Sequence, residues 1–288
     1  ALTSDASGSC AVGYQALYSL TEGQYNTAVG YRSLNANQTG DGLTAVGYNS
    51  LLLSTGNDNT AMGRESLSSN TSGASNTGLG IWAGFGNATG GSNTYVGASA
   101  GKGVANNNNS NNVGIGKDAL LSVTTGSNNT VIGRLAADAI TSGGSNIVIG
   151  DSALGTATTA TANVVIGGDA MSAVPSGQAI ANVVAIGTNA FVGSGSTTTD
   201  TDGTIAIGKD SLKSLVSGQR NLAVGFQAAE DLTQGDDNIA IGYLALNGMT
   251  TDANASENIG IGNYVMDVGS NSASTAHNVC IGHNSGTL

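Results

Sequence analysis

The sequence predicts an all-β fold, a stacked β-solenoid of about 16 coils, and three observations support this prediction. A glycine recurs sixteen times, with spacings of mostly 17 residues, and periods of this size are typical of solenoids. An apolar residue precedes each of these glycines, and asparagine lies four residues before it in twelve copies. The chain has 45 Gly, one Pro and only 9% charged residues, whereas disordered chains combine high charge with no ordered apolar pattern.

We refer to these sixteen positions as the repeat glycines. They are Gly13, Gly30, Gly47, Gly63, Gly80, Gly97, Gly116, Gly133, Gly150, Gly167, Gly187, Gly208, Gly225, Gly242, Gly262 and Gly282.

The three residues before each repeat glycine are predicted to form a short strand, because they are small, aliphatic or β-branched. The first and third residues share one face, and the small middle residue lies on the other. Both faces are largely apolar, which indicates burial on both sides. One face can fill the coil, and we expect another copy of the chain to cover the other, with small middle residues allowing close approach. This assigns the contacts between chains to Ala28, Ala45, Ala61, Ala206, Ala223 and Ala240.

The rest of each coil contains a second apolar anchor and a polar turn. Three and four residues after the repeat glycine stands a small residue and then a bulky one, as in Ala16-Leu17 and Ala153-Leu154. The recurring asparagines predict a ladder of side-chain amides that hydrogen-bond from coil to coil. We therefore expect residues 1–288 to form one repeat solenoid that is a segment of a longer fibre.

The repeat resembles that of trimeric autotransporter adhesin heads, which has the form Asn-Ser-x-Ala-Ile-Gly-x-x-Ser. Residues 26–34 (NTAVGYRSL) and 238–246 (NIAIGYLAL) carry the resemblance, which spans essentially the whole chain. It implies a left-handed parallel β-roll in a homotrimer, each coil giving one strand to an inner sheet and one to an outer sheet. The longer period departs from that family, and the wording TAVGYxxL looks more like repeats in fibre and virion proteins of cyanophages and other aquatic viruses. The shared positions are structural, so no functional residue is carried over.

Charge and hydropathy exclude several functions. The net charge is −11, with 19 acidic and 8 basic residues, which argues against binding nucleic acid or an anionic membrane. No run of 18 apolar residues is present, and residues 1–10 do not read as a signal peptide. Cys10 and Cys280 lie in the first and last coils, too far apart for a disulfide.

Aromatic side chains at the position after the repeat glycine are the candidate binding residues. This column contains Tyr14, Tyr31, Tyr48, Phe226 and Tyr243. Such a ladder can stack sugars or other ligands, but it can also stabilise the coils by pairing between strands, and we favour the second interpretation. The longer turns at residues 103–112 and 192–203 are candidate binding loops.

No catalytic site is predicted. His277, Cys280 and His283 offer only three metal ligands, in the terminal coil, and we predict no metal there. Asp151 and Asp169 fall on successive coils, but no ladder of acids recurs. Gly116-Lys117-Asp118 lacks the spacing of a P-loop. No cofactor is expected, although the Asp-rich turns at 200–203 and 236–237 could bind calcium.

We therefore expect a structural segment that forms a rigid homotrimeric rod outside the cell, on a virion (as in a phage tail fibre) or on a bacterial surface. Its partners would be its own copies and a host or cell-surface glycan or protein, without nucleic acid or membrane insertion. The alternatives are a bacterial trimeric autotransporter adhesin head and a tailspike-like polysaccharide depolymerase. An ice-binding solenoid fits less well, because the threonine column gives way to Val and Ile in the second half of the chain.

Overall fold

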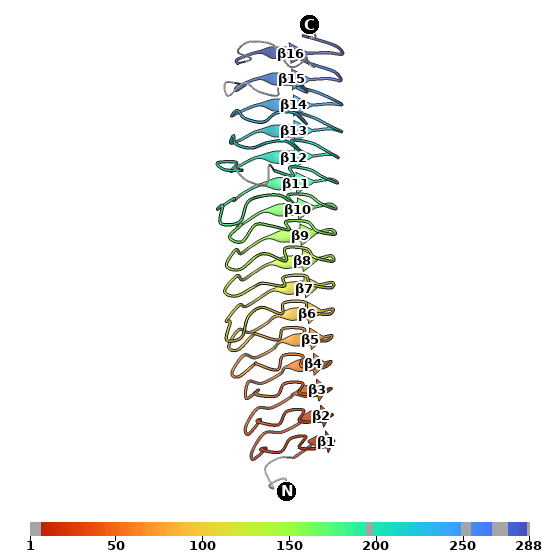
Figure 1. The fold of residues 1–288 in the computed structure, drawn as a ribbon, viewed down its shortest axis with the longest axis vertical. Coiled ribbons are helices and arrows are strands. Elements are labelled where there is room, and N and C mark those ends of the chain that lie inside the picture. Colours follow the sequence, from red (N-terminus) through yellow and green to blue (C-terminus); the bar gives the residue numbers. More distant parts are fainter. Residues whose placement is uncertain (1–6, 194–197, 249–254, 267–275, 287–288) are drawn as a thin grey trace. The chain divides into compact units, whose positions relative to one another are not determined.

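A computed structural model describes residues 7–193, 198–248, 255–266 and 276–286 (Figure 1). The chain divides into two compact units, Ala1–Gly143 and Gly144–Leu288. In both, three-residue strands pair in parallel and in chain order, one strand for each coil, and no helix occurs within the described ranges. The predicted all-β solenoid with about sixteen coils is thereby confirmed.

The first unit contains eight strands: β1 (Cys10–Val12), β2 (Thr27–Val29), β3 (Thr44–Val46), β4 (Thr60–Met62), β5 (Thr77–Leu79), β6 (Thr94–Val96), β7 (Val113–Ile115) and β8 (Thr130–Ile132). Equivalent repeat positions pair with one another; Thr27, for example, is in register with Thr44, and Ala28 with Ala45.

The second unit also contains eight strands: β9 (Ile147–Ile149), β10 (Val164–Ile166), β11 (Val184–Ile186), β12 (Ile205–Ile207), β13 (Leu222–Val224), β14 (Ile239–Ile241), β15 (Ile259–Ile261) and β16 (Val279–Ile281). The register again follows the repeat, as in the pairing of Ile239 with Ile259. Insertions that lengthen a coil are therefore accommodated in its turns and do not shift the strands.

The repeat glycine is required because the next coil passes too close for a side chain. Gly30 has φ 135°, a conformation that residues with a Cβ rarely adopt. A Cβ on this residue would lie 2.8 Å from the carbonyl carbon of Gly47 in the following coil. The same close approach recurs along both units, which explains why the glycine is present in every coil.

The predicted asparagine ladder is confirmed. In the first unit, Asn76 Nδ2 donates to Asn59 Oδ1 at 3.1 Å, and the backbone N–H of Asn76 donates to the same oxygen at 2.9 Å. The second unit repeats the pattern between Asn238 and Asn221. These amides are buried, so the ladder satisfies polar groups that would otherwise be costly to bury.

The interior of each coil is filled by two kinds of side chain. The middle residue of the strand is buried in β2 to β15, and so is the bulky residue four positions after the repeat glycine, for example Leu34, Leu51 and Leu154. The predicted second anchor is thereby confirmed. Instead of an outer strand, however, the backbone here turns through left-handed residues such as Arg32 and Leu34. Coils still hydrogen-bond to each other there, as between the N–H of Leu34 and the carbonyl of Ser50.

Tyr95 is the one bulky aromatic residue among the middle positions of the first unit, and its coil is built around it. Glycines replace the usual side chains beside it at Gly78, Gly84, Gly101 and Gly114, and a Cβ on Gly84 or Gly114 would lie 3.0 Å from the tyrosine ring. The Tyr95 hydroxyl bonds to Asn109 Oδ1. Asn109 belongs to the longer turn 103–112, so this part of the predicted binding loop closes the interior.

Candidate functional site

The outward face of the sheet is formed by the first and third residues of the strands. In the second unit all sixteen of these residues are Ile, Val or Leu, and none of them is buried. At the ends of this unit Ile147 is 43% exposed and Ile281 is 67% exposed. Parallel sheets are normally covered on both faces, so the single chain leaves an unusually large apolar surface open to solvent.

The first unit has the same outward face with a different composition. The first position is Thr in six of the eight strands, with Cys10 and Val113 as the exceptions, whereas the third position remains apolar throughout. Val12 is 56% exposed and Met62 is 47% exposed. Half of this face is therefore a column of hydroxyl groups.

The alanines predicted to contact other chains lie on the other face of the strand. Ala28, Ala45, Ala61, Ala206 and Ala223 have no exposed surface in the single chain, and Ala240 has 1%. A side chain inside the coil cannot contact another chain, so this assignment was wrong. The middle residue points into the coil even where it is β-branched, as at Val131, Val148 and Val165, and its two neighbours point outward. The face available to another copy is formed by those neighbours.

The tyrosine column of the first unit is a stack of rings. Tyr14, Tyr31 and Tyr48 follow the repeat glycine in three successive coils, and consecutive ring centroids are 5.3 Å apart with interplanar angles of 16° and 7°. Because the rings cover each other's faces, they expose mainly edges and hydroxyl groups. This geometry favours the interpretation that the tyrosine rings pair successive coils and stabilise the stack.

Trp82 lies further along the same edge, between two cations. The Arg64 guanidinium carbon is 4.8 Å from the indole ring centroid, and Lys102 Nζ is 5.0 Å from it. The indole Nε1–H donates to Glu65 Oε2 at 2.6 Å. We name Arg64, Trp82 and Lys102 the Trp82 cluster. Trp82, the only tryptophan in the chain, stands one position further from its repeat glycine than the tyrosines, so the repeat pattern does not place it in their column.

The second unit has an aromatic strip with a different geometry. Phe226 and Tyr243 are tilted by 51° at 5.7 Å, and Tyr243 meets Tyr264 edge to face at 77°. Tyr264 in turn meets His283 at 86°, and Lys209 Nζ lies 5.4 Å from the Phe226 ring. The predicted residues Phe226 and Tyr243 thus contact each other and gain two partners that the sequence did not suggest. These contacts again link successive coils.

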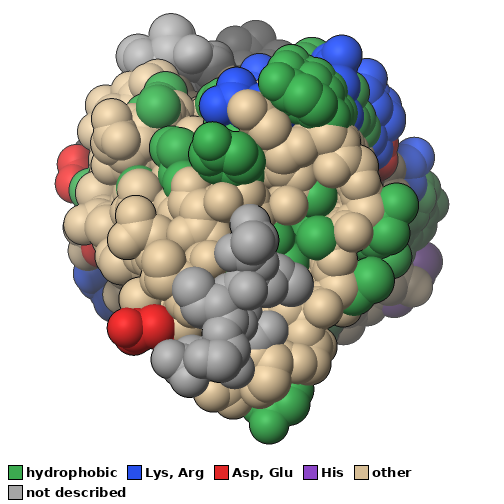
Figure 2. Space-filling model, turned by 90° about the horizontal axis from the view of Figure 1, so that it is seen from below, with side chains coloured by type: hydrophobic (Ala, Val, Ile, Leu, Met, Phe, Trp, Pro, Cys, Tyr) green, Lys and Arg blue, Asp and Glu red, His purple; other side chains and the backbone are tan. Residues whose placement is uncertain are grey.

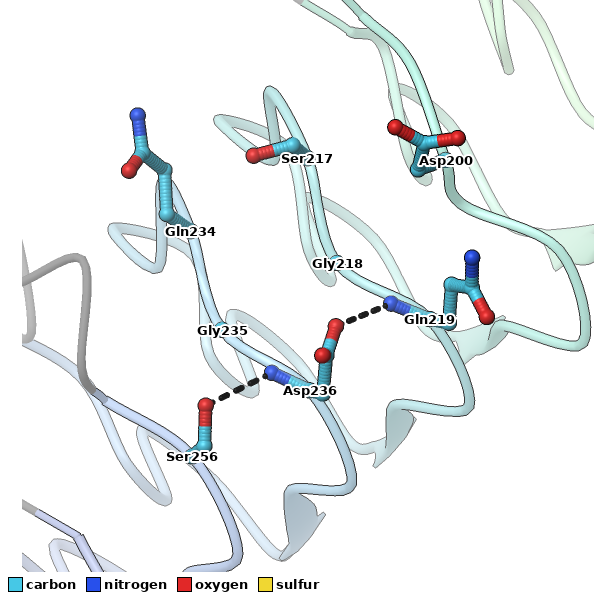
Figure 3. Close-up of a pocket in the computed structure, with 8 residues that line it drawn as sticks. All are labelled: Asp200, Ser217, Gly218, Gln219, Gln234, Gly235, Asp236 and Ser256. Atoms are coloured by element: carbon cyan, nitrogen blue, oxygen red, sulfur yellow. Dashed lines mark hydrogen bonds between the residues drawn. The ribbon is translucent and has the colours of Figure 1, made fainter.

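Acidic and hydroxyl side chains gather on the turns that precede the strands of the second unit (Figure 3). The backbone N–H of Gln219 donates to Asp236 Oδ1 at 2.8 Å, and that of Asp236 donates to Ser256 Oγ at 3.0 Å. With Asp200 these residues line a depression of about 350 Å³. The carboxylate therefore links neighbouring coils, and calcium binding here stays a prediction. Arg220 pairs with Asp237 through two hydrogen bonds of 2.7 and 2.8 Å.

The other residues considered for chemistry lie apart from one another. His277 pairs with Glu257 at 3.1 Å, whereas His283 contacts Tyr264 and Cys280 is the middle residue of β16. Within the described ranges, no group of three or more His, Cys, Asp or Glu side chains could hold a metal ion. The N–H of Asp169 donates to the carbonyl of Asp151 at 3.0 Å, which confirms that these acids occupy successive coils. Residues 194–197 of the second predicted binding loop lie outside the described residues.

The described residues contain no helix long and apolar enough to span a membrane. No protein-family profile matches the sequence, and no curated protein matches it.

Proposed function

We propose that this chain is a structural segment of an extracellular fibre, on a virion or a bacterial surface, whose copies associate side by side through the outward face of the sheet. The observation that supports this proposal is the composition of that face in the second unit, where every first and third strand residue is aliphatic. Exposed apolar surfaces of this regularity are typical of sites that bind another protein.

The energetics favour covering this face. Removing one CH₂ group from water stabilises the product by about 0.8 kcal/mol. With two outward aliphatic residues in each of the eight strands of the second unit, even one such group per residue gives a gross gain of roughly 13 kcal/mol. That gain is comparable to the roughly 4–15 kcal/mol that association costs in lost freedom of motion. The threonine column of the first unit would contribute hydrogen bonds to the contact, and it would bury less apolar surface than the aliphatic column of the second unit.

The proposed number of copies is three, which is what the resemblance to trimeric adhesin heads implies. A second copy of the chain fits this face better than an unrelated partner, because the outward face of that copy repeats the same side chains with the same spacing from coil to coil. Because the alanines point into the coil, the first and third residues of their strands point outward, where they can interdigitate between chains. The fibre would serve as a scaffold and as an adhesive surface towards host or cell-surface glycans.

Analytical ultracentrifugation of the full chain tests the proposal. We expect the mass of a trimer, and we expect Ile239→Asp to give monomers because it places a charge in the apolar contact. Gln234→Asp, which adds the same charge to an exposed turn of the same coil, should leave the trimer intact. A wild-type chain that sediments as a folded monomer at all concentrations would rule out the proposed association.

A further inference from the structure

Basic residues are confined to one edge of the first unit. Its five Lys and Arg residues stand one, two or five positions after a repeat glycine, on the side of the coil that carries the tyrosine stack and the Trp82 cluster; they are Arg32, Arg64, Lys102, Lys117 and Arg134. The same edge also carries Glu65, Asp118 and Asp138, and the turns before the strands carry Glu22, Asp41 and Asp58. In the view from the N-terminal end, Lys and Arg side chains lie beside hydrophobic ones (Figure 2).

We propose that this edge binds an anionic polysaccharide, with the Trp82 cluster as its central contact. The proposal names the ligand class for the adhesive role proposed above and rests on that role. It concerns residues that lie outside the outward face of the sheet, so it can be tested separately from association.

The Trp82 cluster has two cations and one adjoining carboxylate, Glu65, so its net charge is positive. Among the described residues, the structure shows no ion pair for Arg64 or Lys102, while Glu65, the nearest carboxylate in the sequence, accepts the hydrogen bond from the Trp82 indole. Both cations lie about 5 Å from one ring centroid, so an anion bound beside this ring would be attracted by both charges. A carboxylate or sulfate group is therefore the expected partner of the cluster.

The aromatic groups indicate that the anion is carried by a sugar. Pyranose rings present an apolar C–H face to an aromatic surface and hydroxyl groups to polar neighbours. Arg64 and Lys102 lie over the Trp82 ring, so the aromatic and hydroxyl contacts come from the exposed edges of Tyr14, Tyr31 and Tyr48 in three coils of the same edge. An extended chain running across the coils would meet these tyrosines and the Trp82 cluster.

The spacing of the cations favours a polysaccharide over a nucleic acid. Coils recur about every 4.8 Å, and only some of them carry a basic residue on this edge. A nucleic acid strand carries one phosphate about every 3.4 Å, so most of its charges would have no partner on this edge. A polysaccharide with one acidic group for every one or two sugars matches the lower density. The net charge of −11 adds to the repulsion of a nucleic acid.

Binding of polygalacturonate to the full chain at low salt tests the proposal, with dextran as the neutral comparison and a single-stranded oligonucleotide as the phosphate comparison. We expect polygalacturonate to bind most tightly and its affinity to fall as salt rises. Arg64→Gln should weaken binding about tenfold, because it removes one charge-assisted contact. The control is Arg220→Gln, which removes one positive charge from the turns before the strands of the second unit and should change the affinity less than twofold.

Three outcomes would overturn the proposal: equal binding of dextran, tighter binding of the oligonucleotide, or equal losses for the two arginine variants. Sedimentation of every variant separates this proposal from the one on association. Trimers that bind no polygalacturonate would refute only the ligand, whereas monomers that bind it with Arg64 dependence would refute only the association.

Discussion

The two units share an interior and differ in their outward face. In the first unit the outward positions of β2 are Thr27 and Val29, whereas those of β14 in the second unit are Ile239 and Ile241. The middle residues of these strands, Ala28 and Ala240, are both buried alanines. A single coil geometry therefore tolerates a hydroxyl column or an aliphatic column on its outer surface without a change of register.

This difference separates what specifies the coil from what specifies its contacts. The repeat glycine, the asparagine ladder and the buried anchors occur in both units and satisfy steric and hydrogen-bonding needs inside the chain. The first strand position is not constrained in this way, so it is free to change with the partner surface. Changes inside the coil should thus affect stability, and changes on the outward face should affect association.

The largest effect is expected from Tyr95→Ala. This substitution empties the interior of a coil whose neighbours are glycines, and large-to-small changes of buried aromatic residues cost about 3–5 kcal/mol. The control is Thr94→Ala, the adjacent residue on the outward face, which should cost less than about 1 kcal/mol in stability. Denaturant unfolding monitored by circular dichroism compares the two. If both substitutions lowered the free energy of unfolding by similar amounts, the interior and the outward face would contribute equally to stability.

A smaller effect is expected from breaking the asparagine ladder. Asn93 Oδ1 accepts hydrogen bonds from the backbone N–H of Asn112 at 3.0 Å and from its side-chain amide at 3.3 Å. Asn93→Ala leaves the buried backbone N–H of Asn112 without a partner, which costs about 1–3 kcal/mol, whereas the side-chain amide of Asn112 keeps Asn109 Oδ1 and the carbonyl of Gly126 as acceptors. Asn35→Ala removes a partly exposed bond to the carbonyl of Gln15 and should cost less. Hydrogen exchange of the Asn112 amide would show whether the loss is local, as expected for a repeat array.

The sequence predicted the parts of this fold that depend on strict spacing. The repeat glycine, the asparagine ladder and the buried Leu34 follow from residue types that recur at one position for one physical reason. The assignment of the two strand faces could not be made from hydropathy, because Thr44, Ala45 and Val46 are all small or apolar. Side-chain volume does not decide it either, because the interior holds Ala45 in one coil, Val148 in another and Tyr95 in a third.

The aromatic contacts were predicted only in part for a related reason. Tyr14, Tyr31 and Tyr48 share one repeat position, so their stacking follows from the register. The Trp82 cluster combines residues one, two and five positions after three different repeat glycines. Such contacts depend on the path of the turn and on side-chain length, neither of which a repeat alignment contains.

Alkaline pH should destabilise the first unit through Tyr95. Burial raises the pKa of its phenol, partly offset by a hydrogen bond with Asn112, whereas an unfolded tyrosine ionises near pH 10. Above about pH 10 the unfolded chain loses this proton while the folded chain keeps it, so stability falls by up to about 1.4 kcal/mol for each pH unit. Tyr95→Phe should flatten this part of the profile in denaturant titrations at alkaline pH. An unchanged slope would contradict the assignment to Tyr95.

The smallest effect per residue is expected from exchanging the outward columns, and it tests the comparison most directly. Ile205→Thr with Ile239→Thr gives two strands of the second unit the composition of the first, and should weaken association several-fold because apolar area is lost from the contact. Thr44→Val with Thr60→Val makes the reverse exchange and should strengthen association. Thr39→Val, the same change in an exposed turn, should have no effect in sedimentation experiments across a range of concentrations. If both exchanges left the dissociation constant unchanged while stability fell, the outward columns would belong to the coil itself, and the separation between interior and contact surface would not hold.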